Sequence, residues 1–135
     1  MRKLGLDIGH KSCGFAVTDE LNITVQGIDN YFYPEYKYGE LIQEILRYLK
    51  KYEIILIVVG MPTLPSGKKT ETSFYIEEVV EVLKNLTNIK IVFADENMST
   101  KRAMEILQKL GHKVPEARKK KDMVAAQLIL EDYIK

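Results

Sequence analysis

Residues 3–19 read KLGLDIGHKSCGFAVTD and contain two apolar segments separated by a short polar turn. In the first segment, apolar side chains alternate with small or charged ones, which is the pattern of a half-buried β-strand. The second segment, 13–18, is mostly apolar, and residues 10–12 form a turn next to a glycine. We therefore predict a β-hairpin whose first strand carries a carboxylate, Asp7.

The rest of the chain predicts three further strands and four helices. Residues 23–32 show no helical periodicity and predict a third strand, whereas the β-branched runs 54–59 and 89–94 predict strands buried on both faces. Apolar side chains recur at helical spacing in four segments: 38–52, 76–83, about 99–110 and about 121–134. Ser99 or Thr100 is expected to cap the third helix and Gly111 to end it. Residues 112–120 are expected to form a basic loop.

The order of these elements predicts the fold class. Strands that alternate with helices require crossover connections, so the last two strands should run parallel to the first. We predict an α/β protein with a mixed five-stranded sheet, its three N-terminal strands antiparallel, and helices on both faces. Residues 1–135 are expected to form one domain, because about two thirds of the unfolded surface can be buried at this length.

The composition excludes several classes of protein. Hydrophobic residues make up 46% of the chain, no apolar run approaches the ~20 residues of a membrane span, and the N-terminus lacks a secretory signal. We therefore expect a cytoplasmic protein with no membrane partner. A single cysteine, Cys13, excludes an internal disulfide. The net charge is +1, but residues 101–121 hold eight basic and two acidic side chains, so a nucleic-acid partner would bind there.

Three acidic positions are candidates for chemistry. Asp7 lies inside an apolar strand, where a carboxylate without a partner is costly to bury. Glu96, with Asp95, follows the run 89–94, at the end of the strand where open α/β sheets bind ligands. Asp122 shares a helical face with two alanines, which would let its helix approach the sheet. Each position also has an explanation that involves no chemistry. Asp7 would bond to the backbone of a turn at the end of the strand, Asp95 and Glu96 would be a solvated acidic pair, and Asp122 would interact with the helix dipole.

A shared metal ion would explain all three positions together. Carboxylates brought to one point repel one another unless a hard cation neutralises them, and Mg²⁺ prefers oxygen ligands. His10 and His112 are isolated in the sequence and are interpreted as surface residues, so no zinc site is indicated. The sequence has neither a Ser-His-Asp order nor a Walker phosphate loop.

Four motifs run in order along nearly the whole chain: LDIGHKSCGFAVTD (6–19), VVGMP…SG (58–67), ADENMST (94–100) and KKDMVAAQLIL (120–130). Together they resemble the YqgF family, the Holliday-junction-resolvase-like nucleases linked to maturation of pre-16S ribosomal RNA. The resemblance implies a ribonuclease-H-like fold in which Asp7, Glu96 and Asp122 are both the catalytic acids and the metal ligands. The departure is Asn97, where the family usually has arginine, and asparagine cannot supply that charge to a phosphate.

The activity that the resemblance implies is metal-dependent hydrolysis of phosphodiester bonds. Two Mg²⁺ or Mn²⁺ ions, roughly 4 Å apart, would activate a water and stabilise the leaving oxygen. The residues expected to bind nucleic-acid phosphates are Lys11, Arg118, Lys119, Lys120 and Lys121. The alternative interpretation of the basic run 118–121 is a solvated, mobile loop with no role in binding, because a loop of that kind has the same composition. Lys11 and Lys101 are candidates to compensate for Asn97, and residues 60–69 are either a second substrate loop or a plain connection.

Several alternatives stay open at the level of sequence. The substrate is the 5′ region of the ribosomal RNA precursor or branched DNA; a resolvase of branched DNA would be expected to dimerise, so we expect a monomer or a weak homodimer. A non-catalytic factor acting on ribosomal assembly particles is favoured by the near-neutral charge and disfavoured by the cost of burying three carboxylates. The first motif also resembles the phosphate loop of actin-like sugar kinases, but those need two such domains.

Overall fold

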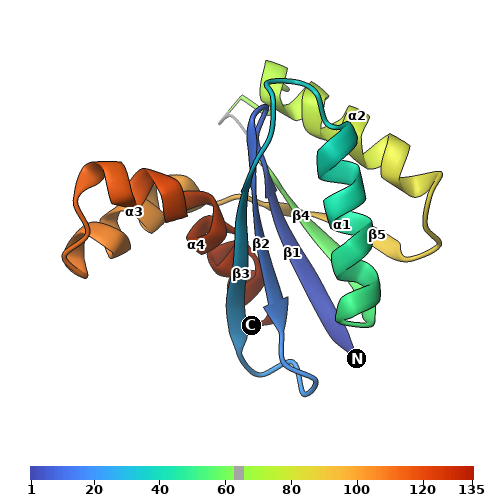
Figure 1. The fold of residues 1–135 in the computed structure, drawn as a ribbon, viewed down its shortest axis with the longest axis horizontal. Coiled ribbons are helices and arrows are strands. Elements are labelled where there is room, and N and C mark those ends of the chain that lie inside the picture. Colours follow the sequence, from blue (N-terminus) through green and yellow to red (C-terminus); the bar gives the residue numbers. More distant parts are fainter. Residues whose placement is uncertain (63–65) are drawn as a thin grey trace.

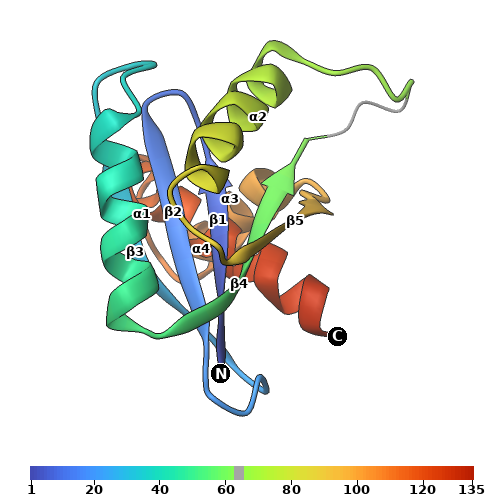
Figure 2. The same ribbon diagram turned by 90° about the vertical axis from the view of Figure 1, so that its right-hand side faces the viewer.

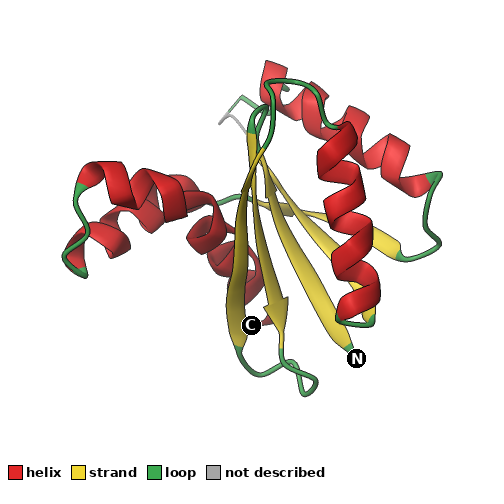
Figure 3. Cartoon of the chain, in the orientation of Figure 1, coloured by secondary structure: helices red, strands yellow, loops and turns green. Residues whose placement is uncertain are grey.

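The structure is a computed structural model that describes residues 1–62 and 66–135. In this part of the chain, three consecutive strands come first, helices and strands then alternate, and two helices come last (Figures 1 and 3). They are β1 (Arg2–Ile8), β2 (Ser12–Thr18), β3 (Val25–Phe32), α1 (Gly39–Lys51), β4 (Ile54–Met61), α2 (Glu71–Lys84), β5 (Lys90–Asp95), α3 (Ser99–Lys109) and α4 (Val114–Ile134). None of the helices in the described residues is long and apolar enough to cross a membrane.

The strands form one mixed sheet in the order β3-β2-β1-β4-β5. β1 pairs antiparallel with β2, and β2 with β3, whereas β4 pairs parallel with β1 and β5 pairs parallel with β4. The predicted fold class is therefore confirmed. β1 lies at the centre of the sheet, and the parallel strands β4 and β5 end at the same edge as β1, where ligands bind in open α/β sheets.

Helices cover both faces of the sheet. α1 and α2 lie on one face, and α4 lies on the other with α3 packed against it (Figures 1 and 2). The larger core lies under α1 and α2 and contains large side chains such as Phe15 and Leu6. The core under α4 contains smaller side chains, among them Ala16 and Ala126. The small residues let α4 lie close to the strands.

The predicted basic loop at 112–120 is wrong, because most of this segment is the first part of α4. α4 begins at Val114, with Pro115 in its first turn, where the missing N–H of proline breaks no helical hydrogen bond. Ala117 is fully buried, so the helix is anchored against the rest of the protein from this turn onward. The basic side chains that follow therefore stand on a helix and not on a mobile loop.

Two further local predictions are also wrong. β5 is an edge strand rather than a strand buried on both faces, and Phe93 is 44% exposed. α3 is not capped by Ser99 or Thr100: its N-cap is Met98, which has a left-handed backbone conformation (φ 56°) and no capping hydrogen bond from its side chain. The apolar side chains of β5 are only partly buried: Ile91 packs against the core under α1 and α2, and Val92 and Ala94 pack against the core under α4.

Candidate active site

Asp7 lies on the α4 face of the sheet because side chains alternate along β1. Leu6 and Ile8 belong to the core under α1 and α2, so the residue between them is directed to the opposite face. On that face, Asp7 pairs across the β1–β2 ladder with Gly14. The Asp7 side chain is 9% exposed, which makes it a buried carboxylate one residue before the end of the central strand.

Asp122 reaches the same place because Gly14 has no side chain. A Cβ atom on Gly14 would lie 1.7 Å from the Asp122 carbonyl oxygen and 2.6 Å from the Met123 nitrogen. The backbone of α4 therefore rests directly on β2 at this point. Asp122 is 6% exposed, and the predicted close approach of the helix to the sheet is observed.

Polar groups on the strands fix the Asp122 carboxylate. Its Oδ2 accepts hydrogen bonds from Ser12 Oγ at 2.6 Å and from Asn30 Nδ2 at 3.2 Å, and its Oδ1 lies 2.8 Å from Lys121 Nζ. Asn30 Oδ1 in turn accepts from the Met123 backbone N–H at 2.9 Å. Ser12 and Asn30 were not predicted, because only the pairing of β1, β2 and β3 brings them to a residue that lies 110 and 92 positions later in the chain, respectively.

Glu96 follows β5 and approaches from the third side. Its backbone N–H donates to the Met61 carbonyl at 3.2 Å, which ties it to the end of β4. Burial raises the pKa of the Glu96 carboxyl, and the neighbouring Asp95 raises it further. Asp95 lies on the exposed edge, where its Oδ1 accepts from the Asn97 N–H at 3.0 Å.

The three predicted acids line one pocket of about 450 Å³, to which Lys11 and Lys121 also contribute. Burial raises the pKa of Asp7 well above its usual range, the carboxylates of Asp122 and Glu96 raise it further, and the Lys121 ammonium lowers it. The Asp7 carboxylate therefore experiences the charges of both other acids.

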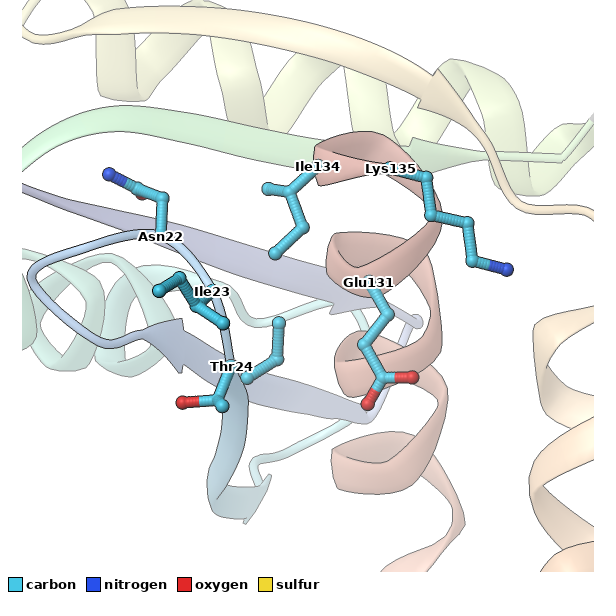
Figure 4. Close-up of a pocket in the computed structure, with 7 residues that line it drawn as sticks. Asn22, Ile23, Thr24, Glu131, Ile134 and Lys135 are labelled. Carbon is cyan, nitrogen blue, oxygen red and sulfur yellow. The ribbon is translucent and has the colours of Figure 1, made fainter.

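A larger hollow, of about 590 Å³, lies elsewhere on the protein. Figure 4 shows it between the β2–β3 turn and the C-terminal end of α4, with Ile23 and Thr24 on one side and Glu131 and Ile134 on the other. It contains none of the residues that the sequence indicated for chemistry and brings no carboxylates together. The smaller pocket at the carboxyl ends of the strands is therefore the candidate active site.

The donor set of this pocket fits a hard divalent cation. Carboxylates from β1, from α4 and from the segment after β5 line it, and the acids Asp122 and Glu96 add to the effect of burial in raising the pKa of Asp7. In the conformation that the structure describes, no three His, Cys, Asp or Glu side chains among residues 1–62 and 66–135 are close enough to ligate one ion together. The Asp122 oxygens face Ser12, Asn30 and Lys121 instead, so coordination requires side-chain rearrangement.

The predicted phosphate-binding residues divide into two groups. Lys11 and Lys121 lie at the pocket, and Lys121 pairs with Asp122. Arg118, Lys119 and Lys120 are exposed on the first turns of α4 and do not line the pocket. The basic run therefore leads along the helix toward the acids.

Asn97, where the resemblance implies arginine, has its side chain beside a carboxylate of α4. Asn97 has a left-handed backbone (φ 51°), and its side chain lies 3.5 Å from Asp132 Oδ2, which also accepts from Arg102 at 2.8 Å. Lys101 is exposed and does not line the acid pocket. The suggestion that 60–69 forms a substrate loop falls partly outside the described residues.

The raised pKa of Asp7 should make the stability of the metal-free chain depend on pH. The folded chain holds the Asp7 proton more tightly than the unfolded chain, so this contribution is present below about pH 4 and is lost as the pH rises through the folded pKa. We expect this component of the pH dependence to disappear in Asp7→Asn. Thermal unfolding followed by circular dichroism in chelator, between about pH 4 and pH 8, measures it; identical profiles for the two chains would contradict the prediction.

Comparison with known proteins gives three consistent results. The sequence model of a family described as "RuvX: Holliday junction resolvase" matches residues 1–135. A relative from Ureaplasma parvum serovar 3 is 41% identical over 141 residues, covering 99% of this chain and 96% of the relative, and one from Mycoplasmopsis pulmonis is 36% identical over 135 residues, covering 99% and 92%. Both bear the name "Putative pre-16S rRNA nuclease".

Two solved structures are similar in fold. Thermus thermophilus RuvC in complex with a Holliday junction substrate superposes with a TM-score of 0.64 at 16% identity, covering 99% of this chain and 94% of that one. The fowlpox virus resolvase in complex with Holliday junction DNA gives a TM-score of 0.59 at 15% identity, with coverage of 99% and 97%. At these identities the likeness concerns the fold.

Proposed function

The chain belongs to the RuvX family, as the motifs resembling YqgF predicted, and on that premise we propose that it is a metal-dependent nuclease that hydrolyses phosphodiester bonds. One observation supports this proposal above all others. Asp7 from β1, Glu96 after β5 and Asp122 from α4 line a single pocket at the edge of the sheet where β1, β4 and β5 end. A scaffold without chemistry could replace three such acids and gain stability.

The residues of the pocket have distinct roles in this proposal. Divalent cations held by Asp7, Glu96 and Asp122 would supply the positive charge that activates a water and stabilises the leaving oxygen. Ser12 and Asn30 hold the Asp122 carboxylate from the side of the strands. Lys121 neutralises part of the acidic charge when it pairs with Asp122 and is close enough to bind a substrate phosphate when it leaves that pair.

The substrate proposed is the 5′ region of the pre-16S ribosomal RNA, acted on free or in ribosomal assembly particles. The relatives that carry this name are 36% and 41% identical to the chain over almost its full length. The resolvases solved with Holliday junctions are only 15% and 16% identical, which makes branched DNA the second candidate. A monomer is sufficient for processing one RNA strand, whereas cutting two strands of a junction favours a dimer.

One assay separates these substrates. Purified protein is incubated with 5′-extended ribosomal RNA precursor and with a four-way DNA junction, each in Mg²⁺ or Mn²⁺. We expect cleavage of the precursor at a higher rate than of the junction. Faster cleavage of the junction would instead indicate a Holliday-junction resolvase. Binding of either substrate without cleavage would indicate a nucleic-acid-binding factor that is not an enzyme.

Ser12 and Asn30 are expected to act on catalysis through Asp122. Removing groups that orient a metal ligand typically lowers activity or metal affinity by about 10- to 100-fold. Asn30→Ala and Ser12→Ala should therefore lower the cleavage rate by about that factor and raise the Mg²⁺ concentration needed for half-maximal rate. Asn85→Ala, at an exposed amide next to the last turn of α2, is the matched control. Wild-type rates and metal dependence in both site variants would exclude this role.

The basic turns of α4 are expected to set the salt dependence of binding. Changing Arg118, Lys119 and Lys120 to Gln should weaken RNA binding and reduce the slope of log affinity against log salt by about 2–3, because each phosphate contact releases about one counterion. The control changes three exposed lysines to Gln at the end of the sheet opposite the pocket: Lys50, Lys84 and Lys90. Filter binding at several salt concentrations gives the slopes, and equal slopes for both triple variants would place the RNA elsewhere.

A further inference from the structure

Two aromatic rings stack beside the acid pocket. His10 belongs to the β1–β2 turn and Tyr36 to the connection between β3 and α1. Their ring centroids are 5.2 Å apart, and the ring planes differ by 23°. Neither ring is needed to fill the core, because the His10 side chain is 42% exposed and Tyr36 is 44% exposed. The pair is therefore an aromatic surface open to solvent.

Contacts on several sides fix the Tyr36 ring. The Tyr36 backbone N–H donates to the His10 carbonyl at 2.6 Å, and its hydroxyl donates to Glu71 Oε1 at 2.9 Å. Its ring also meets the Tyr75 ring edge-on, with centroids 5.3 Å apart. The Tyr36 backbone has a φ of 61°, a left-handed conformation that is uncommon for a bulky residue and persists only where its surroundings impose it. These contacts thus fix the position of the ring, on a backbone that is itself in an unfavourable conformation.

The stacked pair lies next to the groups that would perform the chemistry. His10 itself lines the acid pocket, together with Asp7 and Lys11. Three residues of extended chain span at most about 10–11 Å, so the His10 backbone lies within that distance of Asp7. Lys11, the next residue along the chain and also part of the pocket lining, provides a cation that suits a backbone phosphate. An aromatic face, a phosphate-binding cation and the acids therefore occur side by side.

We propose that His10 and Tyr36 form a stacking platform for an unpaired nucleobase next to the cleaved phosphodiester. This inference rests on the proposed nuclease function and narrows its substrate to a single-stranded segment. Aromatic side chains bind bases of any sequence through their flat faces. Bases inside a duplex have both faces covered by their neighbours, so only an unpaired or extruded base can use the platform. Sequence-tolerant binding of a single strand is the expected consequence.

Fluorescence of a stacked base tests the platform. A short single-stranded oligonucleotide, prepared as RNA and as DNA, carries one 2-aminopurine whose emission falls when it stacks on an aromatic ring. Binding is measured in chelator to the chain carrying Asp7→Asn, alone and combined with His10→Ala or Tyr36→Leu. We expect the 2-aminopurine emission to fall on binding, and the affinity to be about tenfold lower with either second substitution, which corresponds to one stacked base. His10→Phe and Tyr36→Phe should retain most of the affinity, because they keep the rings.

The controls separate the platform from folding and from the nuclease proposal. A blunt duplex of the same sequence should bind equally to all of these chains, and circular dichroism reports whether each variant is folded. If the folded His10→Ala variant keeps the affinity and the quenching of its parent chain, the platform proposal is refuted. The nuclease proposal would still stand in that case, provided that the chain with Asp7 unchanged cleaves RNA. The platform proposal would also be refuted if His10→Ala or Tyr36→Leu weakened binding of the duplex as much as binding of the single strand. Wild-type chain that neither binds nor cleaves any nucleic acid would instead refute the proposed function.

Discussion

Asp7→Asn is expected to lower the rate of phosphodiester cleavage by about 10²–10³-fold or more, the loss that follows removal of one charge-stabilising group from an active site. The same change should stabilise the metal-free chain, because it removes a buried carboxylate whose pKa is raised by burial and by two neighbouring acids. A gain on the order of 1 kcal/mol would raise Tm by roughly 4 °C. Cleavage of a labelled RNA and thermal unfolding in chelator measure the two effects.

The matched control is Asp19→Asn at the opposite end of the sheet. Asp19 accepts hydrogen bonds from the backbone N–H groups of Ile23 and Thr24, and these lower the pKa of its carboxyl. Its replacement should leave cleavage unchanged and should not stabilise the chain. If Asp7→Asn cleaved at the wild-type rate, Asp7 would not belong to the active site. If it retained Mg²⁺-dependent stabilisation of wild-type size, Asp7 would not be a metal ligand.

Gly14→Ala is expected to have the largest effect on the structure of the site. The added methyl group would lie 1.7 Å from the Asp122 carbonyl oxygen and 2.1 Å from its carbonyl carbon. Backbone atoms cannot rotate away as a side chain can, so α4 must move off the sheet. Overpacking of this kind costs about 1–3 kcal/mol or more, and the shift carries Asp122 away from Asp7. A displacement of about 1 Å in an active site can lower a rate by about 10²-fold.

Gly39→Ala is the control for adding a methyl group. Gly39 begins α1 and is exposed, and a Cβ atom added to it would meet no other atom within 4 Å. Alanine there should leave cleavage unchanged and slightly raise stability, because alanine favours helix over glycine. Urea unfolding and cleavage rates of the two variants are compared at equal folded fraction. Wild-type stability and rate in Gly14→Ala would show that α4 does not press on β2 as described.

The predictable part of the fold was the part controlled by hydrophobic periodicity. Alternation in 3–8 and the apolar run 54–59 correspond to β1 and β4, and the crossover rule gave their parallel pairing. The first part of α4 was missed because its lysines and arginine carry no apolar stripe. A run of charged residues has good helix propensity, and the signal that Pro115 gives for a helix start outweighs the basic composition.

The acids of the site were predictable, and the residues around them were not. Asp7 and Asp122 stood out because each interrupts an apolar pattern, and both line the same pocket. Asn30 looks like any polar residue in a half-buried strand, and Ser12 like a turn residue. Their contacts with Asp122 depend on strand register and on the depth at which α4 sits over Gly14. Neither the strand register nor the distance of α4 from the sheet can be predicted from the pattern of residues in a single sequence.

Anomalous diffraction from crystals grown with Mn²⁺ tests the metal site most directly, because the scattering of the ion locates it without reference to activity. We expect anomalous density in the pocket at the carboxyl ends of the strands, bonded to oxygens of Asp7, Glu96 and Asp122, and its loss in crystals of Asp7→Asn. Density confined to other parts of the protein, from crystals of a preparation that cleaves RNA in Mn²⁺, would contradict the assignment of these three acids as the metal-binding centre.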